Sequence, residues 1–143
     1  MSDALLSLSD VEVGQALPPR TIHISRASLV QYTGASLDRN RIHWDERFAR
    51  SVGLPDVIAH GMFTMGSAIN IVCDWLGDAG RVVEYGTRFT KPVVVPYESG
   101  ADVEVTGVVT AVDAQTRRAT VELQAMCGTD KVLGRAVAVV VLG

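Results

Sequence analysis

The sequence predicts one α+β domain in which a curved antiparallel sheet wraps around a long buried helix. Residues 61–76 are long enough for a helix and carry apolar side chains on nearly every side, which is typical of a buried helix rather than an amphipathic one. From residue 82 to residue 142, alternating segments separated by turn residues are typical of strands. A buried helix followed by a run of strands favours a sheet that packs around that helix.

The first third of the chain predicts short elements joined by loops. Ser25 is a good N-cap for a helix over residues 26–33, in which Leu29 and Val30 face inward and after which Gly34 ends the helix. The other elements expected here are a turn at 13–19, a short alternating strand at 21–24, and a second short helix that begins at Asp45-Glu46 and ends at Gly53-Leu54-Pro55.

The second half predicts strands. Pro92 and Pro96 interrupt a run of valines, so this run is expected at the edge of the sheet or as a bulge rather than as a central strand. Residues 113–116 are expected to form a turn. Gly77 and Gly80 end the long helix before the strands begin. The expected strands are Val82–Phe89, Ala101–Val112, Ala119–Cys127 and Lys131–Leu142.

Composition favours a single cytoplasmic domain over residues 1–143. The 143 residues are 48% hydrophobic, and the net charge of −3 is spread over mixed signs, so no nucleic-acid partner is indicated. Residues 1–10 have no basic region, so no signal peptide is expected, and the longest apolar run, Ala136–Leu142, predicts no membrane insertion. Cys73 and Cys127 are expected to be buried reduced thiols, and no cysteine or histidine spacing predicts a metal site.

The chemically richest segment is Tyr32–Ala49. It places a carboxylate, a carboxamide and an imidazole (Asp38, Asn40 and His43) within six residues. A carboxylate and an imidazole in one loop can share the two proton transfers by which water is added to a double bond or removed from it. On spacing alone, however, Asp38 would more often be a turn residue and His43 an ordinary surface histidine.

A second signal, Ala59-His60-Gly61-Met62, opens the long apolar segment. A glycine at the start of a helix can offer a bare backbone N–H to a developing oxyanion. Together with the loop, it indicates acid–base chemistry next to a carbonyl.

These two signals resemble the MaoC-type (R)-specific enoyl-thioester hydratases and dehydratases of the hotdog fold. The resemblance covers essentially the whole chain and is strongest to the catalytic B-type subunit of the mycobacterial β-hydroxyacyl-ACP dehydratases. Two positions depart from the pattern, because Leu37 stands where the family has a glycine and Arg41 where it has a proline. Leu37 would narrow the pocket, and Arg41 would reach a phosphate, a partner or solvent. The matching residues are Tyr32, Asp38, Asn40, Ile42, His43, Ala49 and Ala59–Met62.

The resemblance implies reversible hydration of enoyl thioesters carried on CoA or ACP, a step of fatty acid metabolism that needs no cofactor or metal. Asp38 and His43 would hold one water between them, in acid and base roles that the sequence leaves interchangeable. The N–H of Gly61 would bind the thioester carbonyl. Asn40 would brace the loop, His60 would support it, and Ser67 or Thr64 would supply a second donor.

The resemblance also implies a dimer, since family members join two hotdogs edge to edge. The chain would pair with itself or with a second hotdog subunit that lacks the Asp–His pair. Two other functions stay open. One is a hotdog thioesterase, for which the nearest helix carboxylate, Asp74, is about three turns from Gly61. The other is a non-catalytic acyl-binding or partner subunit of a dehydratase, which only Leu37 and Arg41 favour.

Overall fold

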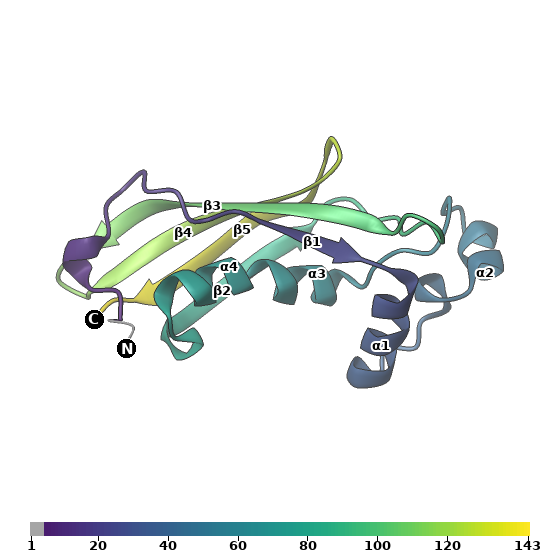
Figure 1. Ribbon diagram of the computed structural model, residues 1–143, viewed down its shortest axis with the longest axis horizontal. Coiled ribbons are helices and arrows are strands. Elements are labelled where there is room, and N and C mark those ends of the chain that lie inside the picture. Colours follow the sequence, from purple (N-terminus) through teal and green to yellow (C-terminus); the bar gives the residue numbers. More distant parts are fainter. Residues whose placement is uncertain (1–4) are drawn as a thin grey trace.

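The computed structural model describes residues 5–143 and contains one five-stranded antiparallel sheet in the order β1-β3-β4-β5-β2. The first four residues, part of the amino-terminal segment considered above, lie outside the described range. The long strands extend over α3 (Gly61–Ala68) and α4 (Asn70–Leu76) (Figure 1). The other two helices, α1 (Arg26–Ser36) and α2 (Glu46–Ser51), gather at one end of the molecule. The strands are β1 (Arg20–Ile24), β2 (Val82–Phe89), β3 (Ala101–Asp113), β4 (Arg118–Cys127) and β5 (Asp130–Val141).

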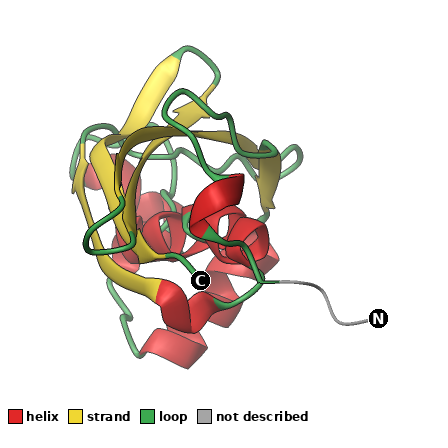
Figure 2. Ribbon diagram, turned by 90° about the vertical axis from the view of Figure 1, so that its left-hand side faces the viewer, coloured by secondary structure: helices red, strands yellow, loops and turns green. Residues whose placement is uncertain are grey.

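Side chains along the long strands are alternately buried and exposed, so one face of the sheet packs against the helices. Seen along its length, the sheet curves over them (Figure 2). One face of β3, β4 and β5 is buried, and it forms a common core with the helix residues Ile71, Val72 and Leu76. The predicted α+β hotdog architecture is thereby confirmed. The helices are α1 (Arg26–Ser36), α2 (Glu46–Ser51), α3 (Gly61–Ala68) and α4 (Asn70–Leu76), with 3-10 turns η1 (Leu8–Asp10), η2 (Arg41–His43) and η3 (Ala79–Arg81).

The prediction of one continuous, wholly buried helix over 61–76 is wrong in two respects. Ile69 belongs to neither α3 nor α4. The Tyr85 hydroxyl of β2 donates to the carbonyl of Met65 at 2.9 Å, and the helical bond from the Ile69 N–H to that carbonyl is long, at 3.4 Å. A side chain that enters the hydrogen-bond ladder is a known cause of a kink. In addition, the face that carries Met62 and Gly66 is exposed.

α1 also differs from its prediction. Gly34 lies inside the helix, which continues to Ser36, and Val30 is exposed, whereas Leu29 is buried as expected. The helix ends at Leu37, which adopts the left-handed conformation with φ 62°. A glycine, which the resemblance places at this position, adopts the left-handed conformation without strain, whereas a leucine does not. The side chain of Leu37 is 67% exposed, so it does not narrow the pocket.

Leu37→Gly is expected to raise the free energy of unfolding by about 0.5–1 kcal/mol. Relief of the left-handed strain, about 1–2 kcal/mol, exceeds the added entropy of a glycine in the unfolded chain. Thermal or urea unfolding of the variant measures the change. Val30→Gly, at an exposed position inside the same helix, is the matched control and should destabilise the protein. A loss of stability in Leu37→Gly would contradict the strain argument.

The proline-interrupted valine run lies outside the five strands but still pairs. Ile58 and Val94 form an isolated antiparallel bridge. The N–H of Ala59 donates to the carbonyl of Val93, and the N–H of Val95 donates to that of Val57, each at 2.9 Å. Val57 and Val95 are fully buried. This short ladder fixes the chain immediately before α3.

Candidate active site

Local hydrogen bonds shape the loop between α1 and α2. The Asp38 carboxylate accepts from the N–H of Asn40 at 3.1 Å, and the Asn40 carboxamide oxygen accepts from the N–H of Ile42 at 3.2 Å. These side-chain-to-backbone bonds make successive tight turns that lead into η2. The Asn40 side chain is thus hydrogen-bonded to the main chain of its own loop.

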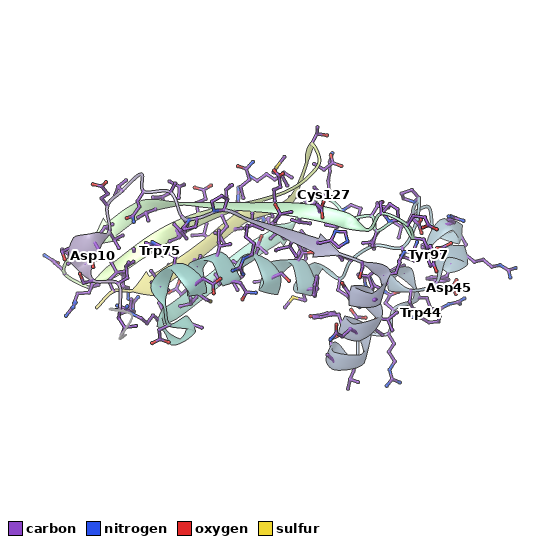
Figure 3. All side chains as sticks on the ribbon, in the orientation of Figure 1. Asp10, Trp44, Asp45, Trp75, Tyr97 and Cys127 are labelled. Atoms are coloured by element: carbon purple, nitrogen blue, oxygen red, sulfur yellow. The ribbon has the colours of Figure 1, made fainter. Side chains whose placement is uncertain are left out.

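A salt-bridge network joins the helices that flank this loop. Arg26 of α1 is largely buried and pairs with Asp56 at 2.8 Å and with Glu46 of α2 at 2.7 Å. Its Nε–H also donates to the carbonyl of Val95. Because Arg26 contacts three segments at once, α1, α2 and the valine ladder form one platform for the loop. Trp44 and Asp45 lie at this end of the molecule (Figure 3).

His43 is buried, and its orientation is fixed by the main chain. Its Nδ1 lies 2.7 Å from the carbonyl oxygen of Ile58. A carbonyl only accepts, so Nδ1 carries the hydrogen and the neutral ring presents Nε2 as an acceptor. Nε2 lies 3.9 Å from Oδ2 of Asp38, whose side chain is 52% exposed. The structure thus brings the predicted pair together, with one member inside and one at the surface.

Burial is the main influence on the pKa of His43, and it lowers that pKa below 6.5 because the charged ring loses solvation. The hydrogen bond to Ile58 acts in the opposite direction, His60 lowers the pKa further, and the Asp38 carboxylate raises it. The uncharged imidazole is therefore favoured near neutral pH.

His43 and Gly61 line the same cavity, of about 350 Å³. Gly61 is the first residue of α3, and its N–H donates to no backbone carbonyl within residues 5–143. A Cβ at Gly61 would lie 3.0 Å from the ring of Phe89. The remaining lining residues are Ile42, Ile58, Ala59, Thr64, Phe89, Thr90, Lys91, Pro92, Val93, Val132 and Leu133.

The other predicted site residues lie around this cavity without lining it. Asp38 and Asn40 lie in the loop beside His43, and Ser67 lies on α3, one turn after the lining residue Thr64. Arg41 pairs with Asp45 at 2.7 Å and lies over the ring of Phe48. Trp44 lines a separate apolar hollow with Val30, Thr33 and Arg39.

Two contributors to the site, the carbonyl of Ile58 and the ring of Phe89, were not predicted from the sequence. Both reach the site through tertiary pairing, Ile58 by its bridge to Val94 and Phe89 as the last residue of β2. A backbone carbonyl has no residue signature, and Phe89 resembles any aromatic strand residue.

Asp38, His43 and His60 each place a potential ligand atom within 4.8 Å of the others. The two imidazoles are stacked, with ring centroids 3.7 Å apart and planes inclined by 23°. Lone pairs of stacked rings lie in nearly parallel planes and cannot converge on one ion. The donor set therefore does not fit a metal site without rearrangement.

Comparison with known proteins shows which family this chain is similar to. Residues 10–126 match the family described as MaoC like domain. The chain is 36% identical over 83 residues to 3-hydroxyacyl-thioester dehydratase X of Mycobacterium tuberculosis. The aligned residues cover 58% of this chain and 29% of that protein. It is 31% identical over 87 residues to an (R)-specific enoyl-CoA hydratase of Rhodospirillum rubrum, covering 60% of each.

Among solved structures, one titled MaoC-like dehydratase superposes with a TM-score of 0.95 at 42% identity, covering 97% of this chain and 43% of that one. The match thus spans less than two thirds of the length of each of these three proteins. Within residues 5–143, no helix has both the length and the apolar character that crossing a bilayer requires. The family match extends over most of the chain and includes both sequence signals, and the chain belongs to the MaoC-like domain family.

Proposed function

We propose that this protein is a hydro-lyase that reversibly hydrates enoyl thioesters to (R)-3-hydroxyacyl thioesters carried on CoA or ACP. The observation that carries the proposal is the position of His43 and Gly61 on one cavity, with the Asp38 carboxylate 3.9 Å from His43. The names of the curated relatives, a thioester dehydratase and an enoyl-CoA hydratase, point in the same direction.

The thioester carbonyl would lie at the start of α3, where its oxygen accepts the N–H of Gly61. The positive end of the helix dipole favours the enolate-like charge that forms as water adds. Thr64, a buried residue one turn further along the cavity, is placed for the second donor more favourably than Ser67, which does not line it.

Asp38 and His43 would hold one water molecule between them. The water oxygen bonds to the β-carbon while its proton passes to the pair, and the pair returns one proton to the α-carbon. The pair therefore ends the addition with as many protons as it began with, and dehydration runs the same steps in reverse. The residues require neither a metal nor a cofactor for these steps.

The direct test is hydration of crotonyl-CoA by the purified chain, followed as loss of the enoyl absorbance. Formation of a 3-hydroxybutyryl thioester supports the proposal. Release of free thiol would mean a thioesterase, although the helix carboxylate Asp74 lies on α4, pairs with Arg20 and does not line the cavity. Turnover that appears only when a second hotdog subunit is added would identify the chain as one half of a heterodimer.

Hydration is expected to persist as the pH falls through 6.5 and to decline below it. Burial lowers the pKa of His43 from 6.5, so the ring stays uncharged to a lower pH than a free histidine does. The unfolded chain then binds more protons than the folded chain just below pH 6.5, so this residue's contribution to stability is also lost as the pH falls there. Measurement of kcat/KM between about pH 5 and 8 checks the sign. An acid limb above 6.5 would contradict it.

The protein is also proposed to act as a dimer through β2. Both β1 and β2 are edge strands. β1 is short and follows two prolines, and both features disfavour pairing with a strand of another chain. β2 has eight residues and exposes Val83 and Phe89. Because Phe89 lines the cavity, a second subunit beside β2 would lie next to the site. Light scattering after size exclusion should give a two-chain particle, and a stable monomer at micromolar concentration would contradict the assignment.

A further inference from the structure

His60 is a buried titratable residue that the proposed reaction does not use. Only 2% of its surface is exposed, although it precedes α3 as the N-cap residue. Its side chain makes no capping hydrogen bond to that helix. The ring points instead toward the loop that carries Asp38 and His43.

Two contacts join His60 to the proposed catalytic pair. Its ring is stacked on the ring of His43, with centroids 3.7 Å apart. Its Nε2 lies 3.1 Å from the main-chain carbonyl oxygen of Asp38. That carbonyl only accepts, so Nε2 carries the hydrogen, and the buried Nδ1 has no hydrogen-bond partner within residues 5–143.

α1 holds the ring of His60 from the other side. The ring of Tyr32 meets it edge-on at 4.7 Å and also meets Phe63 at 5.3 Å, and the Thr33 hydroxyl lies 3.4 Å from Nε2. His60 is thus enclosed by α1, by the first turn of α3 and by the loop. A ring held on three sides has little freedom to turn, so it can restrict the orientation of the His43 ring and of the Asp38 main chain that it contacts.

We infer that His60 is a positioning residue that aims both members of the pair, holding the ring plane of His43 by stacking and the main chain of Asp38 by its Nε2–H. The inference rests on the proposed function for the reaction itself. It adds that the loop geometry depends on a third side chain, which comes from a different segment and does not line the cavity.

The same contact influences how His43 titrates. The titratable or charged groups that face His43 are His60 from the start of α3 and Asp38 from the loop, and the Tyr32 phenol packs behind His60. After burial and the hydrogen bond to Ile58, His60 is the next influence on His43, and it lowers the pKa of that residue. Removing the second imidazole should therefore raise the pKa of His43.

Two substitutions separate the two contacts. His60→Phe keeps a ring against His43 but removes the donor to Asp38, whereas His60→Gln keeps an amide donor and removes the ring. Both are expected to lower kcat by about 10–100-fold, the usual effect of removing a group that orients a functional imidazole, with little change in KM. The acid limb of the His60→Phe profile should move to higher pH. His23→Phe, at an exposed histidine that pairs with Asp102, is the matched control and should change neither.

An imidazole ¹⁵N NMR measurement on the folded protein tests the positioning without any substrate. In the wild type we expect the Nδ1–H tautomer for His43 and the Nε2–H tautomer for His60. In His60→Phe, His43 should titrate at higher pH.

An Nδ1–H tautomer in wild-type His60 would overturn the inference even if neither variant folds. Unchanged kcat in both folded variants, or a loss of kcat with an unshifted His43 titration, would overturn it as well. If the tautomers and the shift are as expected but the wild type does not hydrate enoyl thioesters, the proposed function fails and the positioning stands.

Discussion

Asp38→Asn and His43→Ala are each expected to reduce crotonyl-CoA hydration by about 10²–10⁴-fold, with the fold intact. A group that transfers a proton in the transition state contributes a factor of that size. Asparagine preserves the shape of Asp38 and can still accept the N–H of Asn40, so the loop should keep its turn while the carboxylate is lost. Initial rates, with circular dichroism of each variant, measure the effect.

The chain offers a matched control for each change. Asp45→Asn alters a carboxylate of the same segment that caps α2 and pairs with Arg41, and it should leave the rate almost unchanged because an asparagine also caps a helix. His23→Ala removes an exposed histidine. Because the pair would act as a unit, the double variant should lose little more than either single variant. Full activity in folded Asp38→Asn or His43→Ala would contradict the catalytic role of the pair.

Gly61→Ala is expected to reduce hydration by about 10²–10³-fold, comparable to the loss of one oxyanion donor. The new Cβ would meet the Phe89 ring at 3.0 Å, which is tighter than nine in ten real Cβ contacts. The ring or the first turn of α3 must therefore shift by a few tenths of an ångström. We expect the turn to shift, which moves the N–H away from the carbonyl oxygen. Steady-state kinetics should show the loss mainly in kcat.

Gly66→Ala is the control for this change because it lies on the same helix and a Cβ there meets nothing within 4 Å. Alanine at this position should add up to about 1 kcal/mol of stability through its helix propensity and leave hydration unchanged. Adding Phe89→Ala to Gly61→Ala removes the clash and should restore part of the rate. If Gly61→Ala alone is fully active, the start of α3 does not bind the substrate as proposed.

The strands were predictable because their signals are local. The boundaries of β2 agree with the prediction at both ends, and those of β4 to within one residue, since alternation and turn residues define them within the segment itself. The errors in α1 and in the long helix arise where tertiary contacts override local preference. Gly34 did not end α1, and the Tyr85 hydroxyl enters the long helix from β2.

The candidate site also has one part that local sequence signals predict and another that depends on tertiary contacts. Asp38, Asn40 and His43 lie in one short loop, so their proximity follows from sequence spacing and turn chemistry. The stack of His60 on His43, the carbonyl of Ile58 and the ring of Phe89 come from segments that meet only after the sheet and α3 are assembled. Their roles depend on distances and orientations that no residue pattern encodes.

The pairing of β1 with β3 has a consequence for how the protein is made. Arg20 pairs with Val105, so β1 has no partner until the ribosome has synthesised the second half of the chain. β3, β4 and β5 are joined by short hairpins, which close quickly because their contacts are local. We therefore expect the sheet to form from its carboxy-terminal hairpins, and the loop with Asp38 and His43, although synthesised early, to be among the last parts to take its final shape. Mutations that slow hairpin formation would then lower the yield of active protein while leaving the activity of the molecules that do fold unchanged.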